Sequence, residues 1–262
     1  NLFNLSVQTA SVAVMATGAL LDYVAPVGVL WVCVLILVGI LGFSLVLPEA
    51  TLHHGAELAP AIGRILRQPR VMALMTACFA MSAAHGAFYV FYSIHLAANG
   101  YSKTDVGLLW SLGVVAEILV FLLMPRISGR FSLRTILLVS FAAAVLRFVM
   151  MGWAVASPGA MIFVQLLHGL TFGAYHASAI AAVNQWFPGK SQGRGQALYS
   201  SLSFGAGGLL GALISGWTWD DWGAGWTFSL GAMFALLGWL LVWRWVREGA
   251  DKDFNNKSGG KL

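Results

Sequence analysis

The sequence predicts an all-α membrane protein of about eight transmembrane helices. Of its 262 residues, 59% are hydrophobic and 10% are charged, whereas soluble domains carry about a quarter charged residues. The mean hydropathy is +0.79, and apolar runs of about 20 residues, the length that a helix needs to cross the hydrocarbon core, recur along the chain. The basic residues lie between these runs, so a membrane surface explains the net charge of +5 better than nucleic acid does.

Eight runs have the length and composition of a membrane span. They are approximately Leu5–Leu21, Val27–Leu47, Val71–Leu96, Val106–Met124, Thr135–Ala156, Ala160–Trp186, Ala197–Trp217 and Trp226–Val246. Prolines lie at or near the ends of runs, where a helix can stop without losing internal hydrogen bonds. These are Pro26, Pro48, Pro69, Pro125, Pro158 and Pro188.

The connections between the runs predict how the chain is oriented. With eight spans, every lysine and arginine except Lys103 and Arg147 falls on one side of the membrane. The cations of that side are Arg64, Arg67, Arg70, Arg126, Arg130, Arg134, Lys190, Arg194, Arg244, Arg247, Lys252, Lys257 and Lys261. Cations are retained on the cytoplasmic side, so we expect both ends of this chain in the cytoplasm and the spans in a bacterial inner membrane. The opposite side carries Asp22, Asp105, Asp220 and Asp221.

The longest connection divides the chain unequally. Residues 49–70, which include His53, His54 and Glu57, are interpreted as a cytoplasmic linker between two spans in 1–48 and six spans in 71–247. Residues 248–262 have the composition of a disordered tail. Two plus six spans suit a longer protein that has lost four earlier helices, and the chain does not begin with Met.

Four ionisable residues lie deep inside separate runs, namely His85, Glu117, Arg147 and His168. An ionised side chain at the centre of a spanning helix costs roughly 2.5–3.5 kcal/mol on insertion scales. We therefore expect the four to meet in one polar cavity. The simpler alternative is a buried Glu117–Arg147 pair that only fixes helix packing.

The chemistry of Glu117, Arg147 and His168 predicts proton coupling. Apolar surroundings favour the protonated form of Glu117, whereas a nearby guanidinium favours its carboxylate. Movement of Arg147 relative to Glu117 would therefore switch proton binding, and His168 changes charge in the same pH range.

Polar and aromatic residues share helical faces beside these groups. They form three sets: His85, Phe88, Tyr89 and Tyr92; Gln165, His168, Phe172, Tyr175 and His176; and Trp110, Gly113 and Glu117. Rings with polar tips suit a flat, partly apolar ligand that carries a polar group. The predicted substrate-binding residues are His85, Tyr89, Tyr92, Gln165, Phe172, Tyr175 and His176; alternatively, each stripe only packs against a neighbouring helix.

Other chemistries have little support in the sequence. No phosphate-binding loop, nucleotide fingerprint, HExxH or GxSxG motif is present, and Cys33 and Cys78 lie in apolar runs without metal-ligand spacing. We expect no cofactor, no metal and no nucleic-acid partner. A membrane enzyme or sensor that uses the His and Glu residues is the alternative of a different class. Gly207 and Gly211 form a small-xxx-small pair that lets helices approach closely.

Two blocks of the sequence resemble a known family. The segments His85–Phe131, beginning HGAFYVFYSIHLAANGYSKTDVGLLW, and Gln165–Gly216, beginning QLLHGLTFGAYHASAIAAVNQWFPGK, are similar to phenylpropionate-permease-like proteins. These belong to the major facilitator superfamily and are related to the lactose permease branch. The resemblance implies a partial major-facilitator fold, with the complete C-terminal six-helix bundle and the last two helices of the N-terminal half.

The resemblance also implies a function, which is secondary transport of a small organic solute by alternating access. Glu117, Arg147 and His168 match positions of substrate- and proton-linked residues in the lactose permease relatives. Those relatives carry an acid one turn after the histidine, where this chain has Thr171 and Phe172, so Glu117 becomes the default proton carrier.

We therefore expect a monomeric proton symporter, not an enzyme, whose substrate is an aromatic carboxylate such as phenylpropionate. A sugar or nucleoside symporter and an inactive truncated fragment remain alternatives.

Overall fold

The computed structural model describes residues 28, 31, 34–35, 38–39 and 59–246. The first predicted run, most of the second and the predicted tail therefore lie outside the described residues. Residues 59–246 belong to one unit, which contains helices and no strand. This agrees with the predicted all-α membrane fold.

The first described span consists of two helices, α4 (Pro69–Ala84) and α5 (Gly86–Ala98), which meet at His85. Pro69 occupies the first helical positions of α4, where its missing N–H costs nothing. A short helix, α3 (Ala59–Leu66), precedes it within the segment predicted as a linker. The break places His85 at the centre of the span.

Helix α6 (Lys103–Arg130) begins with a capping box in which Ser102 and Asp105 exchange side-chain to backbone hydrogen bonds. It does not stop at Pro125, as the sequence suggested, but continues through it to Arg130. The prediction was wrong here because a proline forfeits only one backbone hydrogen bond, which a membrane-spanning helix can tolerate.

Helix α7 (Leu133–Trp153) follows directly, with Ser132 accepting from the Thr135 N–H as its N-cap. The next span runs from 158 to 186 and consists of α8 (Pro158–Leu166), η2 (Gly169–Ala174) and α9 (Tyr175–Trp186). Segment η2 is a π-helix, whose wider turn rotates the residues after it relative to a regular α-helix.

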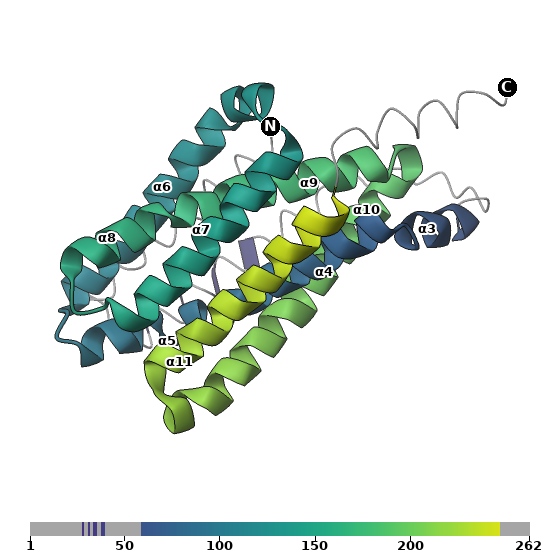
Figure 1. Cartoon of the computed structure of the whole chain (residues 1–262). Coiled ribbons are helices and arrows are strands. Elements are labelled where there is room, and N and C mark those ends of the chain that lie inside the picture. The colour runs from purple at the N-terminus through teal and green to yellow at the C-terminus, as the bar shows by residue number, and fades with distance from the viewer. Residues whose placement is uncertain (1–27, 29–30, 32–33, 36–37, 40–58, 247–262) are drawn as a thin grey trace, which may run out of the picture. The chain divides into compact units, whose positions relative to one another are not determined.

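The last helical segment accounts for two predicted spans. It contains η3 (Gly189–Ser191), α10 (Gln192–Ser200), the π-helix η4 (Ser201–Gly207) and α11 (Gly208–Trp245). Helix α11 reverses at Gly223, whose φ of 76° and ψ of 170° are accessible to glycine alone, and Figure 1 shows its two arms side by side. The Thr218 and Thr227 hydroxyls, 3.1 Å apart, join the arms near the turn.

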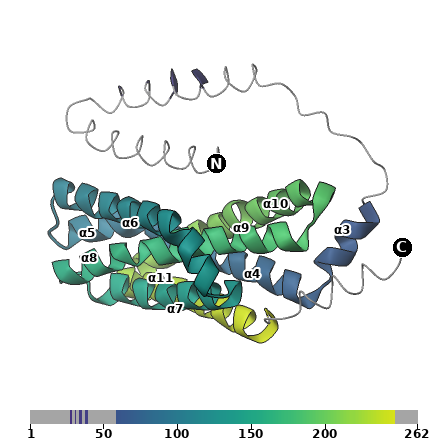
Figure 2. The ribbon, with the colours of Figure 1, turned by 90° about the horizontal axis from the view of Figure 1, so that it is seen from above.

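Five continuous helical segments in the described part are long and apolar enough to cross a membrane. Because the fifth folds back at Gly223, they correspond to the six predicted runs between 71 and 246. The α5–α6 connection lies at one end of this bundle, whereas α3 and the α9–α10 connection lie at the other (Figure 2). Large apolar side chains such as Leu108, Leu213 and Met233 are exposed on its outside, as contact with lipid requires.

Glycines bring α11 against α4 and α5. The Cα positions of Gly211 and Gly86 face each other, and Gly211 also meets the Ala83 backbone while Gly207 meets that of Phe79. The predicted close approach through Gly207 and Gly211 is confirmed. The region around His85 is therefore packed backbone against backbone on the α11 side.

Candidate functional site

Arg147 is the centre of the polar cluster. It projects from α7 and is fully buried, with an exposed fraction of 0%. Its Nε donates to the Val164 carbonyl at 3.1 Å, and its Nη1 lies 3.3 Å from His85 Nε2 and 3.3 Å from Thr171 Oγ1. The guanidinium thus joins the break between α4 and α5 to α8 and η2.

The guanidinium has no acidic partner among the described residues. In the described part of the chain, no carboxylate lies within ion-pair distance of Arg147, and its buried Nη2 has no hydrogen-bond acceptor. Its Cζ lies 4.3 Å from the centre of the Phe88 ring and 5.6 Å from that of Phe148. Cation–π contacts offset part of the cost of burying a charge, but they do not neutralise it.

Glu117 pairs with His168 and not with Arg147. His168 Nε2 lies 3.7 Å from Glu117 Oε2, and both residues are only 6% exposed. The close approach of η2 to α6 makes this possible, because Gly169 packs on the Ala116 carbonyl and Gly173 on the Glu117 backbone. The suggestion that Glu117 and Arg147 form the buried pair was therefore wrong: helix rotation places a histidine beside the acid.

His85 links Arg147 to the backbone in one tautomer. Its Nδ1 lies 2.8 Å from the Met81 carbonyl, which can only accept, so this nitrogen carries the proton. The Nε2 is then the acceptor for Arg147 Nη1. Protonation of Nε2 would turn this contact into a repulsion between two cations, so the geometry favours neutral His85.

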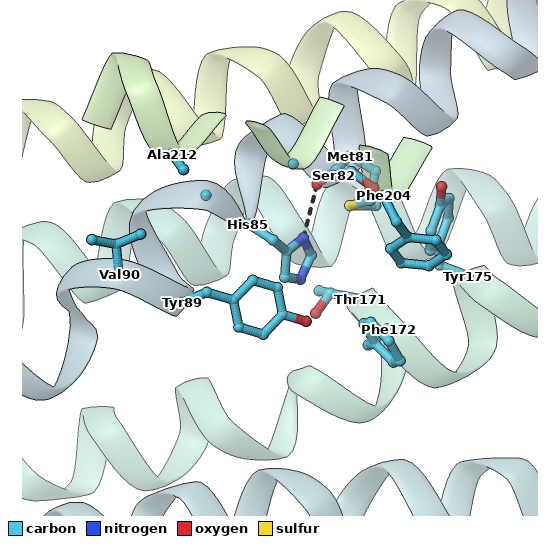
Figure 3. Close-up of a pocket in the computed structure, with 12 residues that line it drawn as sticks. Met81, Ser82, His85, Tyr89, Val90, Thr171, Phe172, Tyr175, Phe204 and Ala212 are labelled. Carbon is cyan, nitrogen blue, oxygen red and sulfur yellow. Dashed lines mark hydrogen bonds between the residues drawn. The ribbon is translucent and has the colours of Figure 1, made fainter. Parts of the chain in front are cut away.

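A cavity of about 140 Å³ opens beside this cluster, between α4, α5, η2 and the η4–α11 segment. Figure 3 shows the Tyr89 hydroxyl, the His85 ring and the Thr171 side chain turned toward one another at its centre, with Phe172 beyond them. Its residues are Met81, Ser82, His85, Gly86, Tyr89, Val90, Thr171, Phe172, Tyr175, Phe204, Gly208 and Ala212. Four of the predicted substrate-binding residues, His85, Tyr89, Phe172 and Tyr175, therefore line one cavity.

The other predicted binding residues lie around that cavity without lining it. Tyr92 and Gln165 are both buried, with exposed fractions of 0%. The Gln165 Oε1 atom rests against Gly113 of α6. His176 Nδ1 lies 2.9 Å from the Tyr199 hydroxyl, one helical turn beyond Phe172.

Three residues of the cluster were not among the predicted proton-coupling or substrate-binding residues. Thr171 touches Arg147, Phe88 lies under the guanidinium, and Trp110 packs 4.6 Å from Phe88 between ring centres. Phe88 and Trp110 lie on the predicted helical faces, so the helical spacing of these faces could have identified them as site residues. Thr171 stood out only as the residue that replaces an acid of the relatives.

Comparison with known proteins agrees with this architecture. The MFS_1 like family model matches residues 10–230. The "Probable 3-phenylpropionic acid transporter" of Escherichia coli (strain K12) is 38% identical over 160 residues, which are 60% of this chain and 41% of that protein. The match thus spans less than half of the relative's length. The extent of the family match shows that this chain belongs to the MFS_1 like family, a group of multi-pass membrane transporters in the major facilitator superfamily.

Proposed function

We propose that this chain is part of a proton-coupled symporter that imports a small aromatic carboxylate by alternating access across a bacterial inner membrane. The observation that carries the proposal is the buried Arg147 guanidinium, which has no carboxylate partner among residues 59–246, beside an aromatic-lined cavity. A buried cation without an anion is costly, and a carboxylate is its natural partner because charge-assisted hydrogen bonds to arginine are strong and can be bidentate.

The surroundings of the cavity suit an aromatic substrate. The rings of Tyr89 and Phe172, which line the cavity, lie near His85 at ring-centre distances of 6.0 and 6.4 Å. Aromatic rings favour offset or edge-on contacts at such separations. The relative is named for transport of 3-phenylpropionic acid, a molecule with an aromatic ring and a carboxylic acid group.

Glu117 and His168 support the proton-coupled part of the proposal. Two titratable groups 3.7 Å apart can share one proton, and they lie on α6 and at the start of η2. His168 also stacks on the cavity residue Phe172, with ring centres 5.5 Å apart. A change in the protonation of the Glu117–His168 pair would therefore affect the substrate site.

Uptake into vesicles that contain the full-length protein tests the proposal. Labelled 3-phenylpropionate should accumulate when the interior is alkaline. The Glu117→Gln variant should lose this gradient-driven accumulation but keep exchange of labelled for unlabelled substrate, because the proton carrier is lost and the substrate site remains. If uptake does not depend on pH and the Glu117→Gln variant accumulates substrate as the unaltered protein does, the proton-coupled part of the proposal is wrong.

A further inference from the structure

Two residues separate Arg147 from the cavity. Among the cavity-lining residues, His85 and Thr171 are those whose side chains contact the guanidinium, both at 3.3 Å from Nη1. Both are themselves almost completely buried, at 3% and 0% exposed. A ligand in the cavity therefore meets these two groups before it meets the cation.

Both contacts are made by neutral acceptors. His85 presents the lone pair of Nε2, because its Nδ1 proton is donated to Met81. The Thr171 hydroxyl donates to the His168 carbonyl at 3.4 Å and so presents a lone pair to Arg147. A carboxylate is a stronger acceptor for a guanidinium than either group, because it is charged itself and can accept two parallel bonds.

We propose that the substrate's carboxylate replaces His85 and Thr171 as the acceptor of the Arg147 guanidinium, which makes Thr171 a residue that sets the affinity for anions. The inference rests on the proposed transport of a carboxylate and adds to it which groups the anion displaces. Nη2 is buried and has no acceptor in the part of the chain that the structure describes, so an incoming carboxylate would gain a second bond there, alongside the one that it takes over at Nη1.

The proposal predicts that two substitutions of Thr171 change the affinity for the carboxylate in opposite directions. Thr171→Val keeps the side-chain shape and removes the competing acceptor, so the carboxylate displaces only His85 and should bind more tightly. Thr171→Asp supplies a permanent anion to Arg147 and should exclude the substrate's anion. A role of Thr171 in packing alone predicts weaker binding for both.

The test is calorimetric titration of the purified full-length protein with 3-phenylpropionate and with its neutral analogue 3-phenylpropan-1-ol. The quantity compared is the ratio of the two dissociation constants, alcohol over carboxylate, since a general loss of packing would affect both ligands. We expect Thr171→Val to raise this preference for the anion roughly threefold to tenfold, the net value of one ordinary hydrogen bond. Thr171→Asp should lower it by at least about tenfold relative to Thr171→Asn, which has the same shape without the charge.

The outcomes separate this inference from the proposed function. If the unaltered protein does not prefer the carboxylate over the alcohol, the proposed anionic substrate is wrong. If it does prefer the carboxylate, but Thr171→Val lowers this preference or the Thr171→Asp and Thr171→Asn variants show the same preference, then the anion does not displace Thr171 and this inference alone is overturned. The Val variant decides the question even if the Asp variant does not fold.

Discussion

Three acceptors and an aromatic ring surround the Arg147 guanidinium from different directions. Val164, His85 and Thr171 accept from Nε and Nη1, and the Phe88 ring lies below the guanidinium plane. A lysine has one ammonium point in place of a planar fork, so it cannot meet all of these groups at once.

The Arg147→Lys variant should therefore lose substrate affinity although its charge is kept. Loss of one or two hydrogen bonds to a charged group, each about 1.5–3 kcal/mol, predicts at least about a tenfold weaker apparent affinity for 3-phenylpropionate in uptake assays. Arg244→Lys is the matched control, because Arg244 is exposed at the end of α11 and its guanidinium lies over the Trp245 ring, 5.3 Å from the ring centre. Equal affinity of Arg147→Lys and the unaltered protein would show that charge alone suffices.

The depth of these residues could be predicted from the sequence, but their pairing could not. Hydropathy places Glu117, Arg147 and His168 inside separate spans, and the cost of burying charges predicts that they face inward. Which two groups meet depends on the rotation and spacing of the helices. Here the glycines of η2 bring His168 to Glu117, while Arg147 reaches His85.

At the level of helices, π-helical turns explain why side-chain positions predicted from a regular 3.6-residue period differ from those in the structure. Segments η2 and η4 interrupt two spans on either side of the cavity. The predicted face Gln165, His168, Phe172, Tyr175 and His176 is split accordingly: Phe172 and Tyr175 line the cavity, whereas Gln165 lies toward α6. Glycine-rich sequence alone does not distinguish such a turn from an ordinary helix.

The contact between α11 and α4 gives a prediction for helix packing. A Cβ atom at Gly211 would collide with the Ala83 backbone, whereas one at Gly216, on the same helix, would meet open space. Gly211→Ala should therefore cost about 1–3 kcal/mol of unfolding free energy through overpacking, while Gly216→Ala should be neutral or stabilise by up to about 1 kcal/mol. Thermal unfolding in detergent compares the two, and equal midpoints would contradict the close packing.

The whole bundle has an asymmetric distribution of charge. The end with the α5–α6 connection carries Lys103 and Asp105, and the turn of α11 carries Asp220 and Asp221. The opposite end includes α3 and the start of α7, with Arg64, Arg67 and Arg134. Arg134 Nη2 donates to the Trp243 carbonyl at 3.0 Å, so a cation also caps the end of α11 there. Charge bias of this kind sets the orientation of a membrane protein.

Labelling of single cysteines should reveal that orientation. In a full-length protein with Cys33, Cys78 and any cysteine outside this chain replaced by alanine, Thr104→Cys and Ser128→Cys place one thiol near each end of α6, at positions that are exposed in the structure. Because arginines are retained in the cytoplasm, a membrane-impermeant maleimide added to intact spheroplasts should label position 104, and position 128 only after permeabilisation. Both variants keep the length of α6 and exchange one small side chain for another, so each serves as the other's control for expression and insertion. Labelling of position 128 in intact spheroplasts would show that the bundle has the opposite orientation. Protons and substrate would then enter the proposed symporter from the end that carries the arginines.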